Sequence, residues 1–272
     1  TRTRRLIMRS YKLPGNRLRL LHTNENWGAV TINEERDYHF RYVLEDNFGN
    51  RRTYQFTVKG KRQDIPEYKP EANEMLYWNR TNVIQKPGME LVVPRYYVYE
   101  DVPLRTDMRG DSSHIAFDYI LDAGRTPIHS YCDLSIGLRH MPVADTTKYY
   151  IVQKAGKWRS SMGGKYANGW IKTRVRSLGT FSVDVDTIAP QITPIGQGGW
   201  RTSRNIRFRI KDMESGIGSY KVYIDGKFVL FGLKKGILVI QDPEKVKKGV
   251  SHKLEVTVTD QCGNMTRKEY KF

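Results

Sequence analysis

The stretch that decides the fold is a strand-turn-strand unit that occurs twice. Residues 38–50 read YHFRYVLEDNFGN, followed at 54–58 by YQFTV. Residues 252–264 read HKLEVTVTDQCGN, followed at 268–272 by KEYKF. In each copy an alternating apolar run ends at Asp-x-x-Gly-Asn and a second alternating run follows. Alternation with a period of two places every second side chain on one face, so each copy is predicted to be an antiparallel hairpin.

The loop chemistry supports this prediction. An aspartate at the start of a turn accepts hydrogen bonds from N–H groups two residues on, and glycine supplies a positive φ at little cost. A hairpin with one apolar face is marginal alone and needs a second sheet. Asp46 and Asp260 are 214 positions apart. The chain should therefore contain at least two β-sandwiches.

The remaining sequence also alternates, and no helical period is present. We predict an all-β chain of tandem immunoglobulin-like β-sandwich modules. Residues 1–63 would be the C-terminal part of a truncated sandwich, 64–186 a larger β-sandwich, and 187–272 an immunoglobulin-like sandwich. The first part is interpreted as cut, because its expected strands are too few for a full sandwich of about seven strands. Those strands, besides the hairpin, are expected within residues 6–12, 17–21 and 29–32.

Further strands follow from the same alternation. In the middle module they include residues 90–94, 96–99, 113–121, 132–138, 149–152 and 181–185. In the last module they include residues 206–210, 220–224, 227–231 and 236–240. Asp225-Gly226 lies between two of these runs and indicates a type I′ turn.

The chain is strongly basic, with a net charge of +17, and the excess is uneven. Residues 1–63 carry 14 basic and 6 acidic groups, and residues 187–272 carry 16 and 8, while the middle of the chain is nearly neutral. A basic balance favours anionic partners, although scattered charges more often only keep a surface solvated. We expect no nucleic-acid partner, because no dense basic cluster is present.

Cysteine usage and apolar runs say little about location. Cys132 and Cys262 fall in different predicted modules, and Cys262 stands where the first hairpin has Phe48, which indicates a small buried side chain rather than a disulfide. No run approaches the 18 apolar residues of a membrane span.

We predict no catalytic, cofactor-binding or metal residues. His114 and Asp118 have the His-x-x-x-Asp spacing, but on a strand they would lie about 13 Å apart, too far to share one zinc ion. Three carboxylates, Asp212, Glu214 and Asp260, should lie at one end of the last sandwich. They are interpreted as turn caps; the alternative is that they bind calcium.

Exposed aromatic residues in the middle module could form a platform that binds carbohydrate. Most of the aromatic residues of the middle module should be core, since strands with a period of two need large apolar side chains. Tyr97, Tyr99, Tyr149 and Tyr150 are expected at the surface.

Several stretches together resemble one protein family. They are residues 11–17, 46–50, 161–166, 186–192 and 215–217, which read YKLPGNR, DNFGN, SMGGKY, DTIAPQI and SGI. The combination resembles the C-terminal, non-catalytic region of lysostaphin-type zinc endopeptidases from Gram-negative envelopes. That family holds zinc with a His-x-x-x-Asp and a later His-x-His in an N-terminal domain. This sequence has no His-x-His, so no catalytic residue is carried over.

The resemblance implies an exported protein of the periplasm or outer membrane, whose catalytic domain and zinc would lie upstream of Thr1. It also implies that Thr187 and Thr146, each after an aspartate, fit an Asp-Ser/Thr-apolar O-glycosylation pattern. The leading functional hypothesis is an accessory binding region of a peptidoglycan endopeptidase that binds an anionic cell-wall or lipopolysaccharide polymer. The alternatives are an adhesion or outer-membrane assembly protein that binds an envelope protein or glycan, and a glycan-active enzyme in the middle module.

Overall fold

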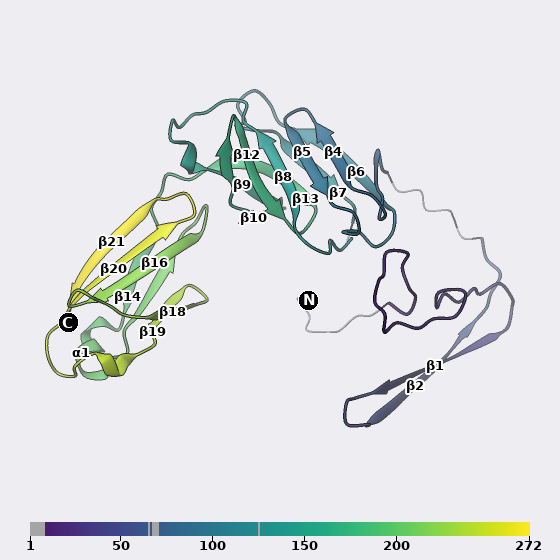
Figure 1. Cartoon of the computed structure of the whole chain (residues 1–272), viewed down its shortest axis with the longest axis horizontal. Coiled ribbons are helices and arrows are strands. Elements are labelled where there is room, and N and C mark those ends of the chain that lie inside the picture. Colours follow the sequence, from purple (N-terminus) through teal and green to yellow (C-terminus); the bar gives the residue numbers. More distant parts are fainter. Residues whose placement is uncertain (1–8, 65, 67–70, 125) are drawn as a thin grey trace. The chain divides into compact units, whose positions relative to one another are not determined.

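The structure is a computed structural model that describes residues 9–64, 66, 71–124 and 126–272. The chain forms two compact units, Thr1–Glu71 and Ala72–Phe272. Nearly all regular structure is antiparallel β-sheet, which confirms the predicted fold class (Figure 1). Helix in the described residues is limited to α1 (Trp200–Ser203) and short 3-10 turns, and none of it is long and apolar enough to cross a membrane.

The first unit contains the first hairpin, formed by β1 (Asp37–Glu45) and β2 (Arg51–Lys59). Its register places the predicted apolar side chains on one face, with Phe40 opposite Phe56 and Tyr42 opposite Tyr54. The rings of Phe40 and Phe56 stack with centroids 5.0 Å apart. Tyr42 and Tyr54 remain exposed. Within the described part of this unit, therefore, the apolar face forms but no second sheet covers it.

The strands predicted at residues 17–21 and 29–32 are wrong, since the described residues before β1 contain no strand. Residues 9–12 of the predicted run 6–12 are also not strand, and residues 6–8 lie outside the described part. Asparagine side chains explain the difference. Asn16 Oδ1 accepts a bond from the Leu18 N–H and Asn24 Oδ1 one from the Gly28 N–H, both at 2.9 Å. Such local bonds hold the backbone in turns instead of a ladder.

The second unit begins with a sandwich of two antiparallel sheets. One has the order β10-β9-β13-β7-β6-β3 and the other β11-β12-β8-β5-β4. The bounds of these strands are β3 Glu74–Leu76, β4 Asn82–Lys86, β5 Met89–Val93, β6 Val102–Arg109, β7 Asp118–Asp122, β8 Cys132–Gly137, β9 Tyr149–Ala155, β10 Trp158–Ser161, β11 Lys165–Ala167, β12 Trp170–Val175 and β13 Gly179–Val185. Tyr119 and Phe181 of the first sheet share a buried core with Leu134 and Ile136 of the second.

Two predicted strands of this sandwich are wrong in whole or in part. Residues 96–99 form a turn, because Tyr96 has a φ of 69° and ends the extended backbone. Of residues 113–121, only those from Asp118 onward are strand. The segment before it is a loop in which Asp111 Oδ1 accepts bonds from both the N–H and the hydroxyl of Ser113.

Strand β9 is buried on both faces. Tyr149 and Ile151 point into the core of the first sandwich, while Tyr150 and Val152 pack on Cys262 of the second. The expectation that Tyr149 and Tyr150 are surface residues is therefore wrong. A strand that is covered on both faces has a continuous run of apolar residues. The prediction assumed strands with one buried and one exposed face, so it placed these residues at the surface. Trp158 of β10 is 79% exposed, although most aromatic residues of this module were expected in the core.

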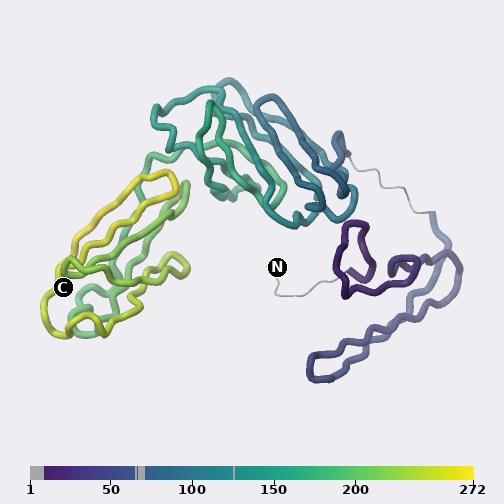
Figure 2. Tube along the Cα trace, in the orientation of Figure 1, coloured from purple at the N-terminus to yellow at the C-terminus, as the bar shows by residue number. Residues whose placement is uncertain are grey.

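The chain passes through residues 186–190 into a second sandwich, as the trace in Figure 2 shows. Its sheets have the orders β14-β15-β19-β18 and β17-β16-β20-β21. The bounds are β14 Gln191–Ile195, β15 Arg207–Lys211, β16 Ile217–Ile224, β17 Lys227–Phe228, β18 Phe231–Lys234, β19 Ile237–Ile240, β20 Lys253–Asp260 and β21 Met265–Lys271. Asp225 and Gly226 have φ values of 50° and 76°, as a type I′ turn requires.

Candidate functional site

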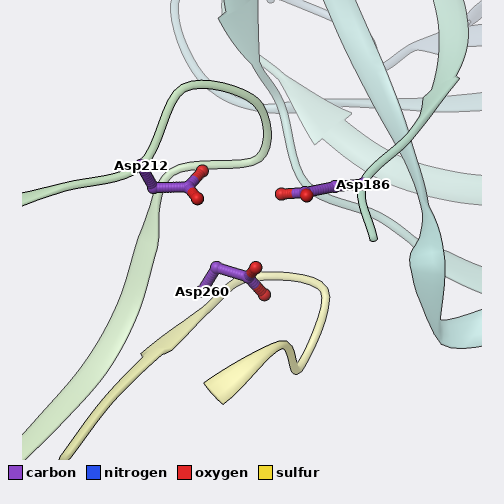
Figure 3. Close-up of side chains that lie close together, drawn as sticks. All are labelled: Asp186, Asp212 and Asp260. Carbon is purple, nitrogen blue, oxygen red and sulfur yellow. The ribbon is translucent and has the colours of Figure 1, made fainter. Parts of the chain in front are cut away.

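Three aspartates meet where the two sandwiches of the second unit join (Figure 3). Asp186 follows β13 of the first sandwich, Asp212 follows β15 of the second, and Asp260 ends β20. We call them the acidic trio. One carboxylate oxygen of each lies within 4.8 Å of the others. Asp186 and Asp260 are buried and Asp212 is partly exposed.

Asp260 caps its own hairpin loop. Its Oδ1 accepts bonds from the Cys262 and Asn264 N–H groups, both at 2.8 Å, and its Oδ2 accepts one from the Asn264 side chain at 2.7 Å. Asp46 makes the same three bonds in the first hairpin, with N–H groups of Phe48 and Asn50 and with the Asn50 side chain. The predicted equivalence of the two loops is confirmed.

Asp186 ties the first sandwich to the second. Its Oδ2 accepts bonds from the backbone N–H and the hydroxyl of Ser215, at 3.0 and 2.6 Å. Its Oδ1 accepts a bond from the Ile188 N–H at 2.9 Å, and the Asn264 side chain donates to its carbonyl oxygen at 3.0 Å. Asp186 and Ser215 are both fully buried. The carboxylate is therefore a structural cross-link across the junction.

Asp212 completes the trio and Glu214 does not belong to it, which corrects the predicted set of Asp212, Glu214 and Asp260. Glu214 instead lies 3.4 Å from the hydroxyl of Tyr150. Asp212 Oδ2 accepts bonds from the N–H groups of Glu214 and Gly216. Burial raises the pKa of Asp212 above its usual value, and the negative charges of Asp186 and Asp260 raise it further.

Further contacts close the junction around the trio. Lys148, whose side chain is largely buried, donates to the Cys262 carbonyl at 3.0 Å. The Thr266 hydroxyl donates to the Pro190 carbonyl. Cys132 and Cys262 are both buried and unpaired, as predicted for Cys262. Burial raises the pKa of each thiol to about 11.

The chemistry of the trio is that of hard oxygen donors, without histidine or thiolate among its three members. Such a set suits calcium or magnesium rather than zinc. The trio supplies one oxygen per residue, against the six to eight that calcium takes. The hydrogen bonds described above account for the same carboxylates as caps and cross-links. Both interpretations of Asp212 and Asp260 are therefore open to a direct test.

The structure separates His114 from Asp118. His114 lies 2.9 Å from Asp111 through its Nδ1, whereas Asp118 pairs with Lys154 at 2.5 Å. Each side chain is engaged with a different partner. His114 lies in a loop and Asp118 in β7, so the His-x-x-x-Asp spacing does not form a shared set of metal ligands.

A shallow basic cleft of about 490 Å³ lies on the outer face of the sheet that contains β11 and β12. Lys165 is directly opposite Lys172 across these strands, and Arg174 is two residues further along β12. The Arg174 guanidinium lies 5.6 Å from the ring centre of Tyr131, which is half exposed. Arg174 also lies 3.7 Å from Asp133. The cleft is not apparent from the sequence, because its residues come from three separate segments.

Asp133 pairs with Arg174, and neither lysine of the cleft has an acidic partner of its own among the described residues. Neither side chain makes a hydrogen bond or ion pair with a described residue. Like charges directly opposite each other on neighbouring strands are destabilising. An anionic group in the cleft would relieve that repulsion.

Comparison with known proteins gives one family match. Residues 73–186, which contain the whole first sandwich, match the Zu5-like domain. No curated protein matches the chain. Among solved structures, the chain is similar at a TM-score of 0.22 and 10% identity to the Ca²⁺-stabilized adhesin that helps an Antarctic bacterium reach out and bind ice. The similarity covers 87% of this chain and 80% of that one.

Proposed function

We propose that this chain is a binding region of adhesion type in an exported protein, and that its first sandwich binds acidic groups of a cell-envelope glycan. The observation that carries the proposal is the basic cleft, where Lys165, Lys172 and Arg174 converge beside the exposed ring of Tyr131. Cations bind carboxylate or phosphate groups, and an aromatic face packs against the apolar face of a sugar ring.

The way the two sandwiches are joined supports a scaffold role. Asp186 and Ser215, together with the buried contact of Cys262 with Tyr150 and Val152, fix the second sandwich to the first. A binding module gains affinity when its surface is pre-organised. A fixed junction would let both sandwiches contact one polymer at a constant spacing.

The Zu5-like match over the first sandwich is compatible with a binding domain. It gives no support to a peptidoglycan endopeptidase as the parent protein, which stays a prediction of the resemblance described above. Of the two envelope hypotheses, adhesion or assembly is therefore the better supported. The periplasm or outer membrane as location is part of the same proposal.

The test is a pull-down with isolated envelopes and, separately, purified sacculi. Wild-type chain should be retained and released by salt, because surface ion pairs are screened. The double variant Lys165→Gln, Lys172→Gln should lose most of its retention. A control variant, Lys221→Gln with Lys271→Gln, carries the same net charge and should bind like wild type. Equal loss in both variants would contradict a specific cleft.

Crosslinking in the same preparation separates the two kinds of partner. A single envelope protein recovered from wild type, without retention on glycan, would favour assembly with a protein. Retention on protein-free glycan favours the proposal.

A further inference from the structure

The outer face of the sheet β14-β15-β19-β18 in the second sandwich carries basic residues and no acidic residue on its strands. Strand β15 places Arg207, Arg209 and Lys211 at every second position, all exposed, while Phe208 and Ile210 point into the core. Lys234 of β18 lies on the same face, because it pairs with Ile237, which in turn pairs with Arg209. We call these four residues the cationic face.

The four charges have no partner in the part of the chain that the structure describes. No side chain of the cationic face makes a hydrogen bond or ion pair with any residue that the structure describes. The residues that flank β15 on this face are neutral: Gln191, Thr193 and Ile195 on β14, and Ile237 and Val239 on β19. No carboxylate of these strands is available to balance the charge.

The opposite sheet of the same sandwich shows the contrast. On its outer face Arg267 pairs with Glu255 at 2.5 Å and Lys253 pairs with Glu269 at 3.0 Å. Among the described residues, Lys221 and Lys271 of this face make no ion pair, but its other two basic residues are paired within the sheet. The unbalanced charge of the cationic face points to a partner outside the chain.

We propose that the cationic face is a second binding site, for a linear polysaccharide that bears carboxylate or phosphate groups. Alternate residues of a strand are about 6.8 Å apart, so the three cations of β15 form a straight row. A row matches an extended polyanion that lies along the strand. The inference adds a site to the proposed function and takes from it only the glycan class of the ligand.

Two other classes of polyanion fit this face less well. Single-stranded nucleic acid is bound by stacking its bases on aromatic side chains. The outward positions of β14, β15, β19 and β18 named above carry none. Proteins that lie on a lipid surface insert apolar side chains between the headgroups. Here Ile195, Ile237 and Val239 lie beside the cations of β15 and are only partly exposed.

The experiment measures binding of the full chain to alginate, a polyuronate, with polyphosphate, neutral dextran, single-stranded DNA and phosphatidylglycerol vesicles as further arms. The face variant is Arg207→Gln, Arg209→Gln, Lys211→Gln. The control variant is Lys221→Gln, Lys253→Gln, Lys271→Gln on the opposite sheet, which removes the same net charge. Circular dichroism and melting show that both variants fold.

We expect wild type and control to bind alginate, polyphosphate or both, and not dextran. The face variant should bind at least tenfold more weakly, with a shallower dependence on salt. Equal weakening in face and control variants would show attraction by net charge and would overturn the site. Tighter binding of DNA or vesicles than of either polymer would overturn the ligand class.

The cleft variant Lys165→Gln, Lys172→Gln separates this inference from the proposed function. If it alone loses binding to alginate and polyphosphate, the cationic face is not a site and the proposed function stands. If the face variant alone loses binding, the inference stands and the cleft is not the contact.

Discussion

Asp186 and Ser215 are hydrogen-bonded twice through a single carboxylate oxygen, although they belong to different sandwiches. Both residues are fully buried, so the pair has no access to water that could replace either bond. A buried N–H that loses its acceptor costs about 1–3 kcal/mol. This pair therefore contributes substantially to the joint between the sandwiches.

Replacing Asp186 by alanine should weaken that joint. Asp186→Ala leaves the N–H and hydroxyl of Ser215 without acceptors, and we expect unfolding free energy to fall by about 2–4 kcal/mol. Cleavage by a protease at residues 187–190 should accelerate. Thr187→Ala, an exposed neighbour, is the control and should change neither measurement. Unchanged cleavage in Asp186→Ala would show that other contacts hold the junction.

Asp212 should make stability depend on pH. Its pKa is raised in the folded protein, so the fold takes up this proton more readily than the unfolded chain does. The corresponding stability is fully present below the unfolded pKa and is lost as pH rises through the folded one. Asp212→Asn is permanently neutral, and one amide oxygen can accept both N–H bonds that Oδ2 now accepts.

We therefore expect Asp212→Asn to melt at a higher temperature than wild type at pH 7. The difference should shrink as the pH is lowered toward the usual carboxyl range. Melting curves of both proteins over that range provide the measurement. A variant less stable than wild type at neutral pH would mean that repulsion within the trio is already neutralised.

Bound calcium would also reduce the repulsion among the three carboxylates of the acidic trio. If the trio binds calcium, millimolar calcium raises the melting temperature of wild type, and Asp260→Asn and Asp212→Asn reduce that rise. Potassium chloride at equal ionic strength is the control for screening by salt. Equal melting temperatures with calcium and with chelator would leave capping and cross-linking as the roles of the trio.

The repeated hairpin loop predicts that alanine costs about the same stability at Gly49 as at Gly263. Gly49 and Gly263 have φ values of 80° and 79°, and a Cβ at either position would contact nothing within 4 Å. The cost of an alanine there is therefore purely conformational, about 1 kcal/mol. Gly263→Asn should cost less than Gly263→Ala, because asparagine tolerates positive φ. Denaturant unfolding of the three proteins measures the order.

The sequence predicted local structure well where one residue determines its own surroundings. Asp46 and Asp260 could be identified as loop caps because the hydrogen bonds of each carboxylate go to residues within five positions along the chain. Asp212 and Asp260 were expected at one end of a sandwich, and they meet there. Asp186 was missed because it reaches the trio only when two separate sandwiches pack, and no local pattern encodes that contact.

Packing between elements explains the other differences. Tyr150 was expected at the surface, since nothing in β9 shows that a second sandwich covers its outer face. The basic cleft and the cationic face also differ in how far they can be predicted from the sequence. Arg207, Arg209 and Lys211 alternate visibly in the sequence, whereas Lys165, Lys172 and Tyr131 come together only through sheet pairing.

The two buried cysteines are natural reporters of local opening in the folded protein. Cys132 lies in the core of the first sandwich and Cys262 in the contact between the sandwiches, and both thiols are protonated and covered in the native state. A thiol-reactive dye can therefore label Cys262 only when the joint parts, and Cys132 only when the first sandwich itself loosens. Mass spectrometry of the two labelled cysteines would give separate opening rates for the junction and for the core of the first sandwich. No reporter group would have to be added to the protein.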